Sequence, residues 1–186
     1  LQRQIARAVA LRRGSPLLAD TNACRLIHGE SDGLPGLIVD EYAGFLVLQL
    51  HTMGMDRLRQ DVVEALEEVV KPKGIYERSD VGTRRADGLK DRPCGLLMGE
   101  EPPELIDIEE NGVRLHIDVR RGQKTGLFLD QRPNRTMLQQ MSAGKSVLDC
   151  FSYTGGFAAH ALKGGAQRVL CLDIARAALA NGRRNL

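Results

Sequence analysis

The sequence predicts an α/β protein, and three observations support this fold class. Two apolar segments, residues 147–148 and 168–172, each lead into an aspartate, and a glycine-containing turn with a helix-like segment lies between them. Apolar residues at strand spacing and at helical spacing also alternate along residues 1–121. With 186 residues and 42% hydrophobic content, the chain can form one large or two small domains.

The first part of the chain predicts a helix, a hairpin and a second helix. Residues 1–13 carry apolar positions at helical spacing. Apolar strands at 36–40 and 45–50, joined by a short turn, predict a hairpin. Residues 55–70 predict one amphipathic helix, which Pro72 ends.

The middle of the chain predicts more strands. Residues 75–78 begin a strand, and the Gly- and Pro-rich stretch at 82–103 predicts a loop or an edge region. Segments 104–109 and 113–119 flank the Asn-Gly dipeptide at 111–112, which is typical of a tight hairpin turn.

The segment 147–157 (VLDCFSYTGGF) is the most informative motif. It predicts a strand that ends at Asp149, a turn that contains Gly155, and a helix. A glycine there lets the backbone approach a ligand at the edge of a parallel sheet. The next strand ends at Asp173, and a carboxylate at that point suits a ribose because it can accept two hydrogen bonds from vicinal hydroxyls. The two strands therefore predict half of a nucleoside site.

The type of ligand depends on the turn between the first strand and the helix. Dinucleotide-binding turns usually carry G-x-G-x-x-G and hold a pyrophosphate at the helix N-terminus. This turn lacks that spacing and is bulkier, with hydroxyl side chains, which favours a ligand without phosphate such as S-adenosylmethionine. The competing interpretation is that the glycines serve packing alone, and the position of Asp173 weighs against it.

The loop at 122–129 allows two interpretations, and in both Asp130 is predicted to N-cap the following helix. In the functional interpretation the loop covers the methionine end of the cofactor, where Lys124 or Arg132 pairs with the cofactor carboxylate. In the other interpretation Lys124, Arg132 and Arg135 are solvated surface residues.

Four segments resemble the bacterial and archaeal family of S-adenosylmethionine-dependent methyltransferases that act on carbon 5 of cytosine in large-subunit ribosomal RNA. They are residues 28–40 (HGESDGLPGLIVD), 75–80 (IYERSD), 119–135 (VRRGQKTGLFLDQRPNR) and the turn at 147–157. Members of that family usually begin with an RNA-binding PUA domain and continue through further strands. The resemblance therefore implies that the chain is a fragment of a longer enzyme.

The resemblance also implies a fold and a domain organisation. The expected fold is a small β/α central domain followed by the first part of a class I, Rossmann-like methyltransferase domain. The expected parts are a linker helix and lead-in (1–28), the central domain (29–103), a β-hairpin (104–121) and the N-terminal part of the S-adenosylmethionine-binding domain (122–186).

The motifs and the resemblance together predict ten contacts to the cofactor S-adenosylmethionine. They are Lys124, Thr125, Arg132, Asp149, Phe151, Ser152, Tyr153, Gly155, Asp173 and Ile174.

The mechanism that the resemblance implies is covalent. A cysteine thiolate adds to carbon 6 of the cytosine, which makes carbon 5 nucleophilic toward the methyl group. Such a cysteine needs a depressed pKa and access to a flipped base. The nucleophile is expected beyond Leu186, so no catalytic residue is assigned and the fragment alone is expected to be inactive. Cys150 is the weaker alternative, because it and Cys171 are predicted to lie in buried strands as small hydrophobes.

The charge of the chain indicates which kind of partner it can bind. The formal net charge is only +2, so the chain as a whole lacks the strong positive field that is typical of nucleic-acid-binding proteins. Local basic clusters are either solvated surface or parts of an RNA-binding face, and ribosomal RNA is the partner that the resemblance implies. The clusters are Arg12-Arg13, Arg84-Arg85, Arg120-Arg121 with Lys124, and Arg183-Arg184.

Other sequence signals concern location and function class. The absence of a secretory leader and of a long apolar span predicts a cytoplasmic protein without membrane contact. The four cysteines show no C-x-x-C spacing, so no metal site is expected. The oligomeric state is open between a monomer and a homodimer. Three function classes stay open: the rRNA cytosine methyltransferase, a methyltransferase for another RNA or a protein, and a non-catalytic RNA-binding module.

Overall fold

The chain folds into two compact units. The computed structural model describes residues 1–90 and 92–186, and all their side chains except that of Thr83. The first unit comprises Leu1–Ile106 and Asp118–Leu127, and the second comprises Asp107–Ile117 and Phe128–Leu186. The domain boundaries expected from the sequence stay a prediction.

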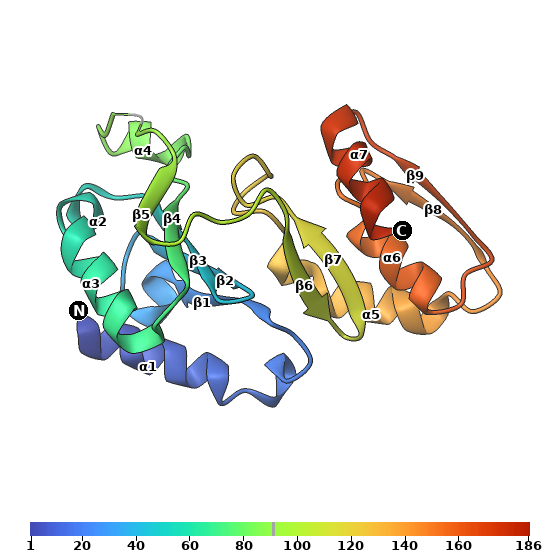
Figure 1. Cartoon of the computed structure of the whole chain (residues 1–186), viewed down its shortest axis with the longest axis horizontal. Coiled ribbons are helices and arrows are strands. Elements are labelled where there is room, and N and C mark those ends of the chain that lie inside the picture. Colours follow the sequence, from blue (N-terminus) through green and yellow to red (C-terminus); the bar gives the residue numbers. More distant parts are fainter. Residues whose placement is uncertain (91) are drawn as a thin grey trace. The chain divides into compact units, whose positions relative to one another are not determined.

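A five-stranded sheet forms the centre of the first unit (Figure 1). Its order is β1-β2-β3-β4-β5; β3 and β4 pair in parallel, and the other neighbours are antiparallel. The bounds are β1 Ala23–His28, β2 Leu37–Tyr42, β3 Phe45–Leu50, β4 Gly74–Glu77 and β5 Gly95–Gly99. The predicted hairpin is confirmed as β2 and β3, whereas the edge strand β1 was not predicted.

The core of the first unit lies between the sheet and two helices. Helix α1 (Gln2–Arg13) packs against α3 (Arg59–Val70) and against β1. All six residues of β3 are buried, so both faces of this central strand are covered. A buried leucine stabilises the fold by about 1.5–3 kcal/mol relative to an exposed one. The fully buried core leucines include Leu26, Leu37, Leu46, Leu48, Leu50 and Leu66.

The helix predicted over residues 55–70 is interrupted, so the prediction of one continuous helix was wrong. Helix α2 (Met53–Arg57) begins after Thr52, whose hydroxyl accepts a hydrogen bond from the Met55 backbone N–H. The backbone leaves the helical conformation at Leu58 before α3 begins. The Met53 N–H donates to the Asp87 carboxylate, which fixes the start of α2 from a distant loop, two residues before the predicted start of the helix.

The Gly- and Pro-rich stretch contains more structure than expected. Its strand β5 lies at the edge of the sheet, which agrees with the prediction of an edge region. The short helix α4 (Thr83–Ala86) was not predicted. The buried Arg84 fixes this turn, because it donates to the Leu50 carbonyl and to the Asp56 carboxylate. Two 3-10 helices, η1 (Pro16–Leu18) and η2 (Gly29–Asp32), flank β1.

The second unit contains the predicted hairpin, formed by β6 (Ile106–Glu110) and β7 (Val113–Ile117). Asn111 and Gly112 both have positive φ, as a two-residue turn of this kind requires. The remaining elements are η3 Leu129–Gln131, α5 Arg132–Met141, β8 Ser146–Cys150, α6 Gly156–Lys163, β9 Arg168–Leu172 and α7 Arg176–Asn185.

Strands β8 and β9 pair in parallel, with Asp149 opposite Cys171. Helix α6 contacts both strands and also packs on α5 and β7, while α7 contacts α6 and β7. The strand–turn–helix–strand order predicted from residues 147–174 is therefore confirmed.

Two details of the prediction were wrong. Asp130 lies inside η3 and does not cap α5; Gln131 precedes α5 and makes no side-chain cap. Pro133 in the first turn of α5 has no N–H and a fixed φ, so that turn depends less on a capping side chain.

The burial of the two parallel strands also differs from the prediction. Cys150 is exposed and Cys171 is partly buried. Alternate residues contact α6, while Leu148, Leu170 and Leu172 on the other face are 56–61% exposed. Along the described residues, no helix is both long and apolar enough to cross a membrane.

Candidate functional site

The turn that joins β8 to α6 has an unusual backbone. Three of its residues, Phe151, Tyr153 and Gly155, have φ between 50° and 74°. Glycine adopts this left-handed region readily, but it is uncommon for aromatic residues. Such strain persists where surrounding contacts enforce it and is concentrated at ligand sites. Here the Ser152 N–H donates to Leu172 O at 3.1 Å and ties the turn to the end of β9.

Asp173 connects the end of β9 to this turn. Its carboxylate accepts hydrogen bonds from the backbone N–H groups of Tyr153 and Ala175, both at 2.8 Å. These N–H groups lower the pKa of Asp173, so it is ionised at neutral pH. The Ile174 N–H also contributes to this lowering; since a carboxylate has about four acceptor positions, acceptor capacity is left for hydroxyl donors of a ligand.

Asp149 lies at the end of the adjacent strand. Burial raises its pKa; the Ala158 N–H opposes this shift, and the negative charge of Asp173 adds to it. Its Oδ2 atom is buried and has no hydrogen-bond partner among the described residues. Two mutually repelling carboxylates at the ends of parallel strands are stabilised by a ligand that brings donors or positive charge.

Exposed apolar side chains flank the two carboxylates. Phe151 directly follows β8 and is 90% exposed. Ile174 directly follows Asp173 and is 100% exposed. The Tyr153 ring packs edge to face against the Phe128 ring, with centroids 5.7 Å apart. The two free apolar side chains offer contact area for a flat ring.

Helix α7 packs closely onto the turn. A Cβ on Gly155 would lie 3.6 Å from Gly182 Cα, and one on Gly182 would lie 3.3 Å from the Thr154 carbonyl carbon. The Asn185 side chain donates to Thr154 O at 2.8 Å and accepts from the His116 N–H of β7. A cavity of about 150 Å³ remains between the turn and α7, lined by Ser152, Tyr153 and Gly155 of the turn and by Gly182 of α7.

These features fit the nucleoside half of S-adenosylmethionine. Asp173 retains acceptors for a ribose diol, and Phe151 and Ile174 present apolar surface for an adenine ring. The paired negative charges of Asp149 and Asp173 suit a ligand that carries a sulfonium and an ammonium group. Ser152 is 5% exposed and supports the turn through its backbone.

The predicted contacts Lys124 and Thr125 belong to the first unit, whereas the other eight belong to the second. Lys124 is exposed and has a φ of 53°. Thr125 is fully buried, and its hydroxyl donates to Asp40 Oδ2 at 2.6 Å and lies 2.9 Å from the Tyr42 hydroxyl. Its side chain therefore anchors the loop within the first unit.

Two buried groups hold this loop. Asp40 forms a bidentate ion pair with Arg25, at 2.8 and 3.0 Å, in addition to its bond with Thr125. Arg78 donates to the carbonyls of Val119 and Gly122 at 2.8 and 3.0 Å. The GQKTG segment is thus presented by a preformed polar network.

Arg135 is buried, so the surface interpretation of this residue was wrong, whereas Arg132 is only partly buried. Arg132 donates to the Asn111 side chain in the hairpin turn at 2.6 Å. Arg135 is 2% exposed and forms two bonds, at 2.6 and 2.7 Å, with the fully buried Glu110 of β6. Its guanidinium also lies 6.0 Å from the Phe157 ring centroid.

His160 completes this buried cluster. Its Nε2 lies 3.2 Å from Glu110 Oε1, and its Nδ1 lies 2.9 Å from Gln139 Oε1. The cluster connects β6, α5 and α6, and it was not predicted from the sequence. The one available signal was the carboxylate of Glu110 in a strand directly before the hairpin turn.

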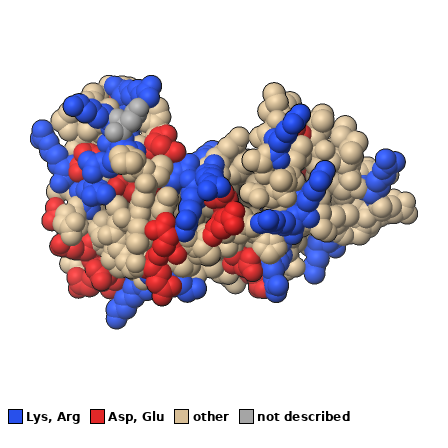
Figure 2. Space-filling model, turned by 45° about the horizontal axis from the view of Figure 1, so that its top comes forward, with Lys and Arg blue, Asp and Glu red and all other residues tan. Residues whose placement is uncertain are grey.

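The basic pairs divide into structural and exposed residues. Arg12 forms an ion pair with Asp32, and the buried Arg84 pairs with Asp56. Arg13, Arg121 and Lys124 are exposed. Figure 2 shows Asp and Glu side chains interspersed among Lys and Arg over the first unit, so this view has no purely basic face there.

Known proteins resemble the chain over most of its length. The family described as S-adenosylmethionine-dependent methyltransferase matches residues 25–186. A curated relative from Aeromonas salmonicida (strain A449), named Ribosomal RNA large subunit methyltransferase I, is 49% identical over 161 residues, which cover 87% of this chain and 40% of the relative. A relative of the same name from Aliivibrio fischeri (strain ATCC 700601 / ES114) is 46% identical over 98% of this chain and 46% of its own. The chain spans less than half the length of these curated relatives.

Solved structures share the fold. One from Streptococcus mutans, assigned as an S-adenosylmethionine-dependent methyltransferase, has a TM-score of 0.84 and 30% identity over 99% of this chain and 47% of its own. A methyltransferase complexed with S-adenosylhomocysteine (SAH) has a TM-score of 0.81 and 28% identity, again over 99% of this chain and 47% of its own. The predicted α/β fold class with class I methyltransferase character is confirmed.

Proposed function

Because the chain belongs to the family of S-adenosylmethionine-dependent methyltransferases, we propose that it is the part of a large-subunit rRNA methyltransferase that binds the adenosine half of the cofactor. The family match covers residues 25–186, and the name shared by the curated relatives supports large-subunit rRNA as the substrate.

The carboxylate of Asp173 is the observation that carries this proposal. It is ionised, lies at the end of β9, and is fixed by the N–H of Tyr153 in a strained turn. Two rigid backbone donors preorganise it, so a ribose diol meets an acceptor that does not have to move. We expect Phe151 and Ile174 to contact the adenine ring, and Gly155 to allow its close approach.

Asp149, Lys124 and Arg132 are proposed to act at the methionine end. S-adenosylmethionine, when bound, supplies a methyl group on a positively charged sulfur. We expect Asp149 to orient the amino group and Lys124 or Arg132 to pair with the carboxylate. Thr125 positions the loop that carries Lys124, because its hydroxyl is bound to Asp40.

We propose further that the methylated atom is carbon 5 of a cytosine. That reaction requires a thiolate that adds to carbon 6 of the ring. Burial raises the pKa of Cys24 to about 11, with a further contribution from Glu41, and burial also raises the pKa values of Cys94 and Cys171. These three thiols are protonated at neutral pH and poorly suited to nucleophilic attack. None of them is assigned as the nucleophile, and Cys150 is exposed but has no motif that assigns it.

Mass spectrometry of ribosomal RNA tests the substrate. In a strain that lacks the gene, one cytosine of large-subunit rRNA should lose 14 Da, the mass of one methyl group in place of hydrogen. The full-length wild-type gene should restore the methylation, whereas the same gene with Asp173→Asn should restore much less. A matched control is Asp61→Asn, which removes an exposed carboxylate from α3. Unchanged rRNA in the deletion strain would refute the substrate, and full restoration by Asp173→Asn would refute the site.

A further inference from the structure

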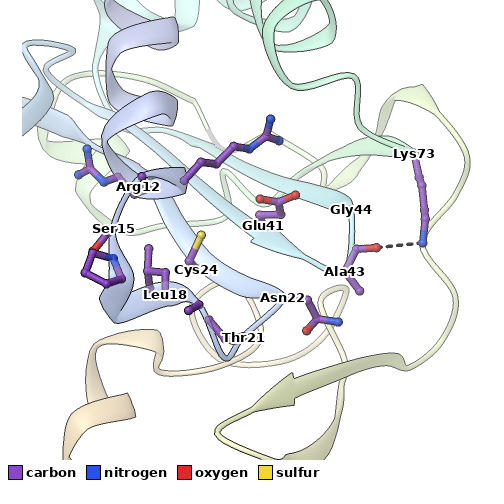
Figure 3. A pocket seen from close by; sticks show the side chains of 14 residues that line it. Arg12, Ser15, Leu18, Thr21, Asn22, Cys24, Glu41, Ala43, Gly44 and Lys73 are labelled. Atoms are coloured by element: carbon purple, nitrogen blue, oxygen red, sulfur yellow. Dashed lines mark hydrogen bonds between the residues drawn. The ribbon is translucent and has the colours of Figure 1, made fainter.

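The first unit contains a cavity that the proposed cofactor site does not use. It lies between the C-terminal end of α1, η1, the start of β1 and the β2–β3 turn (Figure 3). Its volume is about 830 Å³, within the range of about 300–1,000 Å³ typical of small-molecule sites. The ends of several elements form its walls, so the cavity is built into the fold.

Basic side chains lie at two places on the rim of the cavity, with Arg12 and Arg13 at the end of α1 and Lys73 beyond the β2–β3 turn (Figure 3). Arg13 is exposed, and within the described residues its guanidinium makes no hydrogen bond and no ion pair. Lys73 donates one hydrogen bond to Ala43 O at 2.9 Å, which leaves two of its three N–H groups for other acceptors. Arg12 adds positive charge but is paired with Asp32. An anionic group is therefore attracted to the rim.

The inner wall carries a carboxylate. Glu41 lies opposite Cys24 in the β1–β2 register, and Figure 3 shows both side chains in the cavity, with Asn22 nearby. Among the described residues nothing donates a hydrogen bond to the Glu41 carboxylate. Burial raises the pKa of Glu41, and the charge of Arg13 opposes this shift. A half-buried carboxylate without donors is costly, and a ligand that supplies two N–H groups relieves this cost.

From this arrangement we infer that the cavity binds a guanosine nucleotide of the RNA, with the base on Glu41 and a phosphate near Arg13. The inference rests on the proposed RNA substrate. Among the four bases, guanine carries two adjacent donors, N1–H and the exocyclic amino group, on its Watson–Crick edge, and a carboxylate accepts both together. On the same edge, cytosine and adenine carry a single amino group next to an acceptor, and uracil carries one N–H between two acceptors. None of these three bases therefore presents two adjacent donors to a carboxylate. The net positive rim favours a nucleotide over a cationic ligand.

Backbone-amide NMR titration of the chain with guanosine 5′-monophosphate tests the inference. Amide signals of Asn22, Cys24, Ala43 and Gly44 should shift, and cytidine 5′-monophosphate should bind at least about tenfold more weakly. Glu41→Gln should weaken binding of the guanosine nucleotide about tenfold, because the amide replaces one acceptor by a donor. Binding of inorganic phosphate to this variant should be unaffected. Arg13→Gln should weaken both ligands. Glu68→Gln on the exposed face of α3 is the matched control, and the spectra of all variants report whether they are folded.

The outcomes separate this inference from the proposed function. Equal binding of the two nucleotides, shifts elsewhere in the chain, or an unchanged affinity in Glu41→Gln would overturn it. If these occur while the gene still restores rRNA methylation, the cavity assignment fails and the function stands. If the guanosine nucleotide binds as described but rRNA methylation does not depend on the gene, the nucleotide site stands and its assignment to the RNA substrate fails.

Discussion

Replacing Arg135 by methionine should destabilise the second unit by about 3–5 kcal/mol, because it leaves the Glu110 carboxylate buried without its main partner. Glu110 is fully buried and Arg135 is 2% exposed, so water cannot replace the lost bonds. The lost contacts are two hydrogen bonds of 2.6 and 2.7 Å to Glu110 and one of 2.9 Å to Phe128 O.

The pKa of Glu110 reports the net effect of burial, His160 and Arg135 together on its charged form. Burial by itself would raise the pKa, but the interactions with His160 and Arg135 outweigh burial and lower it from 4.5 to about 2. At about 1.4 kcal/mol for each tenfold change, this corresponds to about 3 kcal/mol of stability. Because the folded pKa lies below the unfolded value, that stability is fully present above pH 4.5 and is lost as the pH falls from 4.5 to about 2.

Hydrogen exchange of the α6 amides measures the effect in the second unit. Exchange at pH 7 should accelerate at least about a hundredfold in Arg135→Met, since about 3 kcal/mol corresponds to that factor. The double variant Glu110→Leu/Arg135→Met should recover much of the loss, because it removes both charges. Arg114→Met, an exposed arginine on β7, is the control. Exchange in Arg135→Met that equals the control, or a double variant as unstable as the sum of the single ones, would refute the reasoning.

Three further predictions follow from the packing. Thr125→Val should lower the free energy of unfolding by about 1–3 kcal/mol in urea titrations, because Asp40 and Tyr42 lose a buried partner, whereas Thr125→Ser should stay near wild type; equal stability of the two variants would contradict the role of the hydroxyl. Iodoacetamide at pH 8 should label the exposed Cys150 first and Cys24 last, because Cys24 has a pKa of about 11, and the reverse order by mass spectrometry would be inconsistent with the burial described. Amides of β8 and β9 should exchange faster than those of the buried β2 and β3, and uniform protection across all four strands would speak against this.

Much of the fold was accessible from sequence because local patterns determine it. The Asn-Gly dipeptide at 111–112 produced the predicted hairpin, and the apolar segments that lead into Asp149 and Asp173 became paired parallel strands. The predicted element boundaries were wrong where a residue distant in the sequence contacts the local backbone. Asp87 accepts a hydrogen bond from the Met53 N–H and fixes the start of α2, two residues before the predicted start at 55.

The candidate site was predictable in its carboxylates but not in its basic residues. The Asp149 and Asp173 positions follow from where strands end, which a short apolar segment followed by a carboxylate indicates. Whether an arginine is exposed depends on long-range partners, and Arg135 finds Glu110 at a separation of 25 residues. For the same reason sequence reasoning treated Thr125 as a ligand contact without detecting its buried bond to Asp40.

Calorimetric titration with SAH tests the central claim most directly, which is that Asp173 at the end of β9 holds the ribose of the cofactor. Wild-type protein and the Asp61→Asn control should bind equally. Asp173→Ala should bind more weakly by about 1.5–3 kcal/mol, roughly tenfold or more, because it removes a charged acceptor of two hydrogen bonds. Unchanged SAH affinity in a folded Asp173→Ala variant would contradict the account.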